Sequence, residues 1–312
     1  MESKTMLLIM NPCSGQKVGK RYLADILALF CDAGYIPTVF ITNGPQHGKR
    51  LAAAHAADHD LIVCMGGDGT FNEVMAGVIE SGCHTPIGYI PCGSTNDFAA
   101  SMHLNRQPLQ AARDILDGEP CALDVGKLGE RHFSYIASCG AFTRASYATP
   151  QTMKNTFGHL AYIMEGVKDL KSLRPYHLRI ETEDGVLEDD YVFCAVCNTT
   201  SVAGILTLDP AVVNMQDGLL ELLLIRHPKN AAELNECIVA LQERNYHSPM
   251  LTLCSAARMT VHADPSVEWT LDGEYEQGHD TVTVCNQHNA IRLIVPKEAI
   301  THETIPAEVT RP

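Results

Sequence analysis

The central motif of this chain runs Leu61-Ile62-Val63-Cys64-Met65-Gly66-Gly67-Asp68-Gly69-Thr70-Phe71-Asn72-Glu73. Its first five residues are apolar and indicate a buried strand, and a helical pattern follows the glycines. A strand, a glycine turn and a helix start form a phosphate site, because glycine lets backbone N–H groups approach an anion and the helix N-terminus is partially positive. The carboxylate of Asp68 is placed in this turn to hold Mg²⁺ or to take a proton. The motif therefore predicts chemistry on a nucleotide phosphate.

The size and composition of the chain favour a globular protein of two domains. It has 312 residues, of which 46% are hydrophobic and 19% charged, so a sizeable core is expected. The formal net charge is −14 at pH 7. A chain this acidic is a poor nucleic-acid binder, and an anionic membrane repels it unless basic residues cluster locally.

The cysteines and the apolar runs predict a cytoplasmic protein. The twelve cysteines show no CxxC or metal-finger spacing, which indicates free thiols in a reducing compartment. There is no signal-peptide pattern, and no run approaches the roughly 18 apolar residues that span a bilayer. We therefore expect no transmembrane segment, and any membrane contact to be peripheral and transient.

The first part of the chain alternates between strand and helix patterns, which predicts a parallel sheet covered by helices. The expected strands are Met6–Met10, Thr38–Thr42, Leu61–Met65 and Ile87–Ile90. The expected helices are Lys20–Ala33, His47–Asp58, Phe71–Ser81 and Pro108–Leu116.

The second part reads as a mainly antiparallel β domain, with turn signals between several strand patterns. The expected strands are Phe133–Ser138, His177–Glu181, Tyr191–Cys197, Leu219–Ile225, Arg258–Ala263, Trp269–Leu271, Thr281–Val284 and Ile291–Val295. Two helical patterns interrupt them, at Met153–Leu173 and Ala231–Leu241. The expected domains are 1–126, 127–295 and a C-terminal segment 296–312.

Each N-terminal strand pattern ends in turn chemistry, and these ends meet at one edge of a parallel sheet, where ligands bind. The four turns are Asn11–Gly15, Thr42–Gly44, Gly66–Thr70 and Pro91–Asp97. They supply glycines for close approach, hydroxyls and amides for phosphate oxygens, and carboxylates for a metal. Each one alone reads equally as an ordinary turn, and Thr70 with Glu73 reads as a capping box that only starts a helix.

Two common nucleotide motifs are missing. Gly15 to Lys20 has three residues between its glycines instead of the four of a P-loop, and Arg21 follows where a P-loop has Ser or Thr. The first strand is also not followed by GxGxxG, the fingerprint of dinucleotide-binding domains.

The N-terminal motifs resemble the signature of the soluble diacylglycerol kinase / sphingosine kinase catalytic-domain family. They are Asn11-Pro12-x-Ser14-Gly15, Gly66–Glu73 and Pro91-x-Gly93-Ser94-Thr95-Asn96-Asp97-Phe98. Later motifs extend the resemblance over nearly the full chain: Leu123–Gly126, Asp209-Pro210-Ala211, Asp217-Gly218-Leu219 and Asp272-Gly273-Glu274. Ser94 stands where Thr is more usual, which keeps the hydroxyl. The first two motifs are specific in combination, whereas the Gly66–Gly69 motif alone is shared with NAD kinases.

The resemblance implies an α/β nucleotide-binding domain of phosphofructokinase-like and NAD-kinase-like type and a C-terminal β-sandwich domain. It also implies a cleft between them, with the last segment returning to the first domain. The expected ATP-binding residues are Asn11, Ser14, Gly15, Thr42, Gly66, Gly67, Asp68, Gly69, Thr70, Glu73, Ser94, Thr95 and Asn96. Assembly is common in such domains, so a homodimer is a further expectation.

The resemblance also implies two roles for acidic residues. A structural Mg²⁺ site falls on Asp217, with the backbone of Asn214 and Leu219. Near the phosphates, Asp68 with Asp97 and Asp124 is expected to position Mg²⁺ directly or through water. Glu274 corresponds to the general base of the family, and Asp68 is the second expected catalytic residue. On spacing alone, Glu274 is a hairpin residue after an Asp-Gly turn, and Asp217-Gly218 is a plain turn.

The sequence thus predicts an ATP- and Mg²⁺-dependent lipid kinase, most simply one that converts diacylglycerol to phosphatidic acid. Three alternatives stay open. The first is a kinase that acts on another lipid alcohol, such as a sphingoid base or phosphatidylglycerol. The second is an NAD kinase, and the third is a nucleotide-binding regulator without catalysis.

Overall fold

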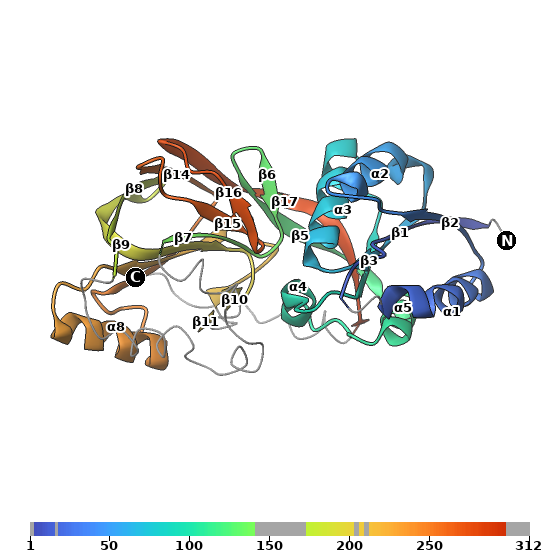
Figure 1. Cartoon of the computed structure of the whole chain (residues 1–312), viewed down its shortest axis with the longest axis horizontal. Coiled ribbons are helices and arrows are strands. Elements are labelled where there is room, and N and C mark those ends of the chain that lie inside the picture. Colours follow the sequence, from blue (N-terminus) through green and yellow to red (C-terminus); the bar gives the residue numbers. More distant parts are fainter. Residues whose placement is uncertain (1–2, 16–17, 141–172, 203–205, 209–211, 298–312) are drawn as a thin grey trace. The chain divides into compact units, whose positions relative to one another are not determined.

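The chain is described from a computed structural model that covers residues 3–15, 18–140, 173–202, 206–208 and 212–297 (Figure 1). It divides into two compact units. The N-terminal unit contains residues 1–123 and the chain from Asn289 onward, and the C-terminal unit contains Asp124–His288. The expected helix at Met153–Leu173, apart from its last residue, and the Asp209–Ala211 motif lie outside the described residues.

The N-terminal unit is built on a parallel sheet in the strand order β17-β4-β3-β1-β2. Its strands are β1 (Lys4–Met10), β2 (Tyr35–Ile41), β3 (Leu61–Gly66), β4 (Ile87–Pro91) and the end of β17 (Thr281–Val295). The four expected N-terminal strands are all present. β3 and β4 are buried along their whole length, as apolar runs are when helices cover both faces of a sheet.

Helices cover the two faces of this sheet (Figure 1). α1 (Val18–Asp32) and α5 (Pro108–Asp117) pack on one face, where Phe30 and Ile115 join a core with Met6 and Leu8 of β1. The other face carries α2 (His47–His55), which continues as a short 3₁₀ turn (Ala56–Asp58), and α3 (Asp68–Ser81). The sequence did not predict the short helix α4 (Asp97–Ser101).

The start of α3 differs from the expectation in a way that matters for the site. The helix begins at Asp68 and not at Phe71, with Gly67 as its N-cap residue, so Asp68, Gly69 and Thr70 form its first turn. The predicted capping box of Thr70 and Glu73 is wrong, because Thr70 lies inside the helix. The backbone N–H groups of this first turn have no partners within the helix.

The C-terminal unit is mainly antiparallel, as predicted, with the strand order β16-β15-β7-β9-β8-β14-β17. β12 pairs with β9 and β13, and β5 pairs with β6. The strands are β5 (Glu119–Leu128), β6 (Arg131–Phe133), β7 (Ile136–Gly140), β8 (Tyr176–Thr182), β9 (Gly185–Cys197), β12 (Leu220–Arg226), β13 (Leu251–Ala256), β14 (Arg258–Ala263), β15 (Trp269–Leu271) and β16 (Glu274–Glu276). A small separate ladder joins β10 (Ser201–Val202) to β11 (Leu206–Thr207).

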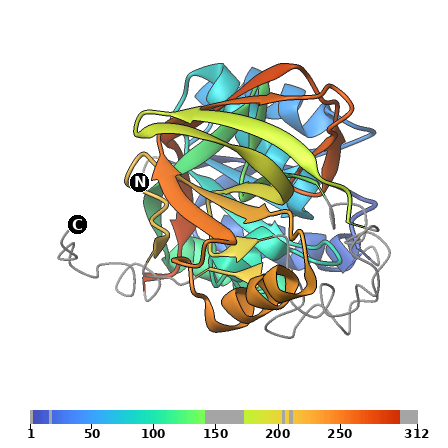
Figure 2. The same cartoon turned by 90° about the vertical axis from the view of Figure 1, so that its left-hand side faces the viewer.

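Three details of the C-terminal unit correct the sequence prediction. The expected strand Phe133–Ser138 is broken into β6 and β7, and the two expected strands after Thr281 are one continuous strand, β17. β5, β13 and β16 were not predicted. The helix expected at Ala231–Leu241 is confirmed as α8 (Ala231–Glu243), which lies below the strands in both views (Figures 1 and 2).

The twelve cysteines are free thiols, as the sequence predicts. Among the residues that the structure describes, no helix has the length and apolarity needed to cross a bilayer.

Gly77→Ala is predicted to destabilise the protein by about 2–4 kcal/mol, although alanine favours helices by about 1 kcal/mol over glycine. A Cβ at position 77 of α3 would lie 2.7 Å from the Cβ of Ala52 and closer still to the carbonyl oxygen of Lys49 in α2. The loss is measured by urea unfolding. Gly44→Ala is the control, because a Cβ there meets nothing within 4 Å. A Gly77→Ala protein as stable as the control would show that the two helices separate without cost.

Candidate active site

Four strand ends of the N-terminal unit lie at one edge of its sheet, as predicted. The N–H of Asn11 donates to the carbonyl of Met65 at 2.9 Å, and the N–H of Thr42 donates to the carbonyl of Met10 at 2.8 Å. The N–H of Cys92 donates to the carbonyl of Gly66 at 2.6 Å. These bonds continue the pairing of the strands into the turns, so the expected nucleotide-binding residues are brought together.

Asn11 and Ser14 bind the first turn of α3. The side-chain amide of Asn11 donates to Oγ1 of Thr70 at 2.9 Å, and Oγ of Ser14 accepts from the N–H of Gly67 at 3.2 Å. Oδ1 of Asn11 also accepts from the N–H of Cys13 at 2.9 Å, which fixes the turn itself. The first motif therefore holds the second in place.

The second and third motifs touch through glycine backbones. A Cβ on Gly93 would lie 2.7 Å from the Cα of Gly67, and a Cβ on Gly15 would lie 2.5 Å from the carbonyl oxygen of Cys92. Gly15 also has a φ of +51°, which disfavours other residues. These glycines are thus required by the packing of one turn on another, a reason the sequence did not reveal.

Asp68 connects α3 to α4. Its Oδ2 accepts from the N–H of Asp97 at 3.0 Å and its Oδ1 from the N–H of Phe98 at 3.3 Å. The carboxylate therefore satisfies N–H groups at the start of α4, a role that no local signal indicates because α4 was not predicted.

Asn96 fixes the turn of the third motif. It is buried, with a φ of +53°, and its side-chain amide both accepts from the N–H of Gly93 at 2.8 Å and donates to the carbonyl of Gly93 at 3.0 Å. The neighbouring Ser94 is exposed and Thr95 is partly exposed.

Glu73 takes part in a different contact from the one expected. Its Oε1 accepts from the N–H of Gln46 at 2.6 Å and its Oε2 from the N–H of Gly48 at 2.9 Å. The carboxylate thus caps the N-terminus of α2, where negative charge is favourable. The capping residue is supplied from α3 across space and not from the sequence before α2.

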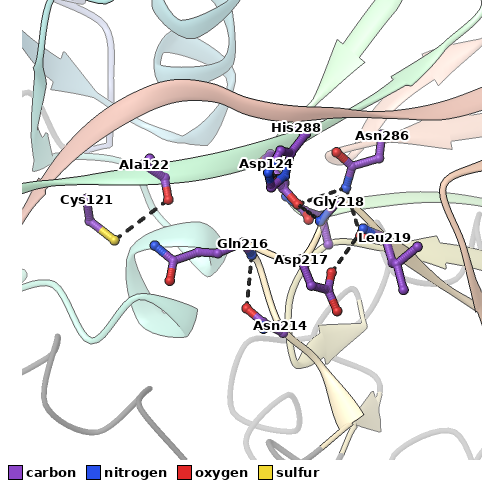
Figure 3. A network of polar contacts seen from close by, with 11 residues as sticks. Cys121, Ala122, Asp124, Asn214, Gln216, Asp217, Gly218, Leu219, Asn286 and His288 are labelled. Carbon is purple, nitrogen blue, oxygen red and sulfur yellow. Dashed lines mark hydrogen bonds and ion pairs between the residues drawn. The ribbon is translucent and has the colours of Figure 1, made fainter. Parts of the chain in front are cut away.

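Asp124 organises a second cluster, in the C-terminal unit (Figure 3). Its side chain is fully buried, and its Oδ2 accepts from the N–H of Gly218 at 2.7 Å and from Nδ2 of Asn286 at 3.1 Å. Nδ1 of His288 lies 2.9 Å from its Oδ1, and Nδ2 of Asn286 also donates to the carbonyl of Leu219 at 2.8 Å. The sequence did not single out Asn286 or His288.

Asp217 and Asn214 lie beside this cluster and are exposed (Figure 3). Oδ1 of Asp217 accepts from the N–H of Leu219 at 2.9 Å, and Oδ1 of Asn214 accepts from the N–H of Gln216 at 3.0 Å. Within the described parts of the chain, no group of three His, Cys, Asp or Glu side chains is arranged to hold a metal. Asp217 thus stands as one exposed carboxylate next to the buried Asp124.

Glu221 is a buried carboxyl that the sequence analysis missed. It lies in β12, and burial raises its pKa to about 8, with the nearby carboxylates of Asp217 and Asp124 adding to the shift. The sequence of β12 does not alternate between apolar and polar residues in a way that marks Glu221, because the neighbours of Glu221 on both faces of the strand are also buried.

Asp272 shapes the hairpin that carries Glu274. It is buried, with a φ of +47°, and its carboxylate accepts from the N–H and Oγ of Ser134 and from the N–H groups of Tyr135 and Ile136, the last two at 3.0 Å. Ser134 and Tyr135, the two residues between β6 and β7, thus direct their N–H groups to a carboxylate instead of a neighbouring strand, which explains the break. Glu274 itself is exposed on β16.

Comparison with known proteins assigns these motifs to a family. Residues 5–128 match the diacylglycerol kinase catalytic domain, and residues 136–295 match the YegS C-terminal NAD kinase beta sandwich-like domain. The chain belongs to the diacylglycerol kinase family. A diacylglycerol kinase of Bacillus subtilis (strain 168) is 31% identical over 299 residues, covering 95% of this chain and 97% of that protein. One from Staphylococcus epidermidis is 31% identical over 307 residues, covering 97% and 95%.

Solved structures show the same fold. A crystal structure of a diacylglycerol kinase from Bacillus anthracis strain Sterne superposes with a TM-score of 0.74 at 19% identity, covering 96% of this chain and 99% of that one. A second structure from that strain gives a TM-score of 0.79 at 21% identity and the same coverage. The predicted α/β plus β-sandwich fold, the family and the lipid kinase class of this enzyme are confirmed.

Asp272→Asn tests whether burial or hydrogen bonding dominates the pKa of the Asp272 carboxyl. Burial raises the pKa of Asp272 to about 6, even though four hydrogen bonds favour its ionised form. An acid with a raised folded-state pKa keeps its proton while the unfolded chain loses it, so the free energy of unfolding falls as pH rises from about 4 to about 6. The stability advantage of the wild type over Asp272→Asn should therefore be about 1–2 kcal/mol smaller at pH 7.5 than at pH 5.0.

The measurement is urea unfolding followed by the fluorescence of Trp269, which is buried in β15. Asp184→Asn, at an exposed hairpin turn, serves as the control and should change little at either pH. An advantage that grows between pH 5.0 and pH 7.5 would show that the four donors outweigh burial.

Proposed function

We propose that this lipid kinase transfers the γ-phosphate of ATP, in the presence of Mg²⁺, to the hydroxyl of a membrane lipid, with diacylglycerol as the first candidate. The observation that carries the proposal is the meeting of three glycine-containing turns at the first turn of α3. Relatives named diacylglycerol kinase over nearly the whole chain support the acceptor. The enzyme would act transiently at the membrane surface.

The first turn of α3 is the proposed phosphate site. Its N–H groups and the partial positive charge of the helix suit the oxygens of a triphosphate. Thr42, Ser94 and Thr95 would add hydroxyls, while Asn11, Ser14 and Asn96 support the turns. Gly15, Gly66, Gly67 and Gly69 keep the backbone open to the ligand. Glu73 belongs to this site indirectly, because it anchors α2.

The residues present fit Mg²⁺. This cation prefers oxygen ligands and keeps several waters, so one or two carboxylates suffice and a cluster of three side chains is not required. Asp217, with backbone at Asn214 and Leu219, would hold a structural ion. Asp68, Asp97 and Asp124 would orient the ion at the phosphates through water. When bound, the ion would neutralise part of the negative charge on the phosphates.

Glu274 is the proposed general base. The lipid oxygen forms a bond to the γ-phosphorus, and the bond from that phosphorus to the bridging oxygen breaks, with its electron pair leaving on ADP. The proton of the lipid hydroxyl passes to the carboxylate of Glu274. An exposed carboxylate on a short strand is accessible to such a hydroxyl.

The decisive experiment measures transfer of labelled γ-phosphate to diacylglycerol, a sphingoid base, phosphatidylglycerol and monoacylglycerol in micelles, with NAD⁺ as a further acceptor. Label in diacylglycerol is expected. Label in another lipid would change the acceptor, and label only in NAD⁺, or ATP binding without transfer, would overturn the proposal. Sedimentation of the same preparation would test the predicted homodimer.

Asp68→Ala is predicted to lower kcat/KM at least about 100-fold, equivalent to about 3 kcal/mol, because α4 loses the acceptor for two N–H groups and the phosphate turn loses its support. The matched control is Asp25→Ala, an exposed carboxylate on α1, which should keep wild-type activity. A fully active Asp68→Ala protein would remove the nucleotide site from this edge of the sheet.

A further inference from the structure

Arg131 of β6 binds two carboxylates on β16. Its Nη2 donates to Oε2 of Glu274 at 2.8 Å, and its Nη1 donates to Oε2 of Glu276 at 2.7 Å. Nη1 also donates to the carbonyl oxygen of Tyr275 at 3.0 Å. One guanidinium therefore contacts every residue of the three-residue strand that carries Glu274.

A second contact joins the same two segments. The N–H groups that directly follow β6, from Ser134 to Ile136, bind the carboxylate of Asp272 at the turn before β16. Among the described strand pairings, β6 pairs with β5 and β16 pairs with β15. The turn before β16 is thus held by the carboxylate of Asp272 and by the N–H of Asp272, which donates to the carbonyl of Ile136 at 2.9 Å, while the side chain of Arg131 links β6 itself to β16.

Stability does not explain the ion pair of Arg131 and Glu274. The two side chains are 34% and 53% exposed, and ion pairs this open contribute little to folding because water and salt screen them. A guanidinium, however, is planar and always charged, and its forked donors hold a carboxylate in a defined orientation. The effect of the pair is to restrict a long side chain that would otherwise rotate on an exposed strand.

The bonding pattern leaves one oxygen of Glu274 available. Within the part of the chain that the structure describes, the hydrogen bond to Glu274 reaches Oε2, and Oε1 accepts none. We propose that Arg131 is a positioning residue for phosphoryl transfer, which holds Oε2 of Glu274 so that Oε1 is presented in one orientation to take the proton. This inference rests on the proposed role of Glu274 as the base.

The experiment compares Arg131→Ala and Arg131→Lys with the wild-type full-length enzyme, using the lipid that the acceptor panel identifies. Arg131→Ala should lower kcat about 10–100-fold, because the orientation of Glu274 is lost. The KM for ATP and the KM for the lipid should stay within about threefold of the wild-type values, because substrate binding is kept. Arg131→Lys should recover part of kcat, since it restores the charge without the fork.

The matched control is Lys127→Ala, which breaks the pair of Lys127 with Glu130 (3.1 Å) in the neighbouring β5–β6 hairpin. Its kcat should equal that of the wild type. The melting temperatures of all variants should agree within about 2 °C, since exposed pairs stabilise little.

A double-variant cycle separates positioning from general damage. In a Glu274→Gln background, Arg131→Ala should leave the residual turnover unchanged, because the group it positions is already gone. A further 10–100-fold loss there would overturn the inference, as would wild-type kcat in Arg131→Ala. Wild-type turnover in Glu274→Gln alone would instead overturn the base role, so failure of the proposed function is recognised separately.

Discussion

The close approach of two glycine backbones, Gly67 at the start of α3 and Gly93 after β4, is the constraint on which the N-terminal site depends. A side chain at either position would push the turns apart. Only with the backbones in contact do the carboxylate of Asp68 reach the start of α4 and the hydroxyl of Ser14 reach the N–H of Gly67. Many polar residues of the motifs therefore bind one another, and the backbone N–H groups at the start of α3, which helix geometry leaves without intrahelical acceptors, point toward the proposed ligand site.

Buried aspartates have the same organising role in the C-terminal unit. Asp124 holds the backbone at Gly218, and Asp272 holds the backbone from Ser134 to Ile136. Each lies close in sequence or space to an exposed acidic residue, Asp217 or Glu274, that remains accessible. In both places a buried carboxylate builds a rigid support from backbone N–H groups, and the proposed chemistry belongs to its exposed neighbour.

The sequence predicted most of the helices and strands and the strand-end turns, because periodicity and turn chemistry are local signals. It could not predict which partners the polar residues choose. Asn286 and His288 reach Asp124 from 162 and 164 residues away, and Arg131 reaches Glu274 from 143 residues away. Glu73 illustrates the limit, since its spacing from Thr70 matches a capping box, yet tertiary packing places its carboxylate on a different helix.

The acidity of the chain places a condition on the proposed ATP site. A net charge of −14 repels a triphosphate at long range, although salt screens this repulsion beyond about 8 Å in physiological solution. Attraction must therefore come from short-range, fixed dipoles and from Mg²⁺. The first turn of α3 meets this condition, because its N–H groups are neutral, aligned and held by Asn11, Ser14 and Asp68. That need for alignment explains why so much of the three motifs is used to fix the backbone.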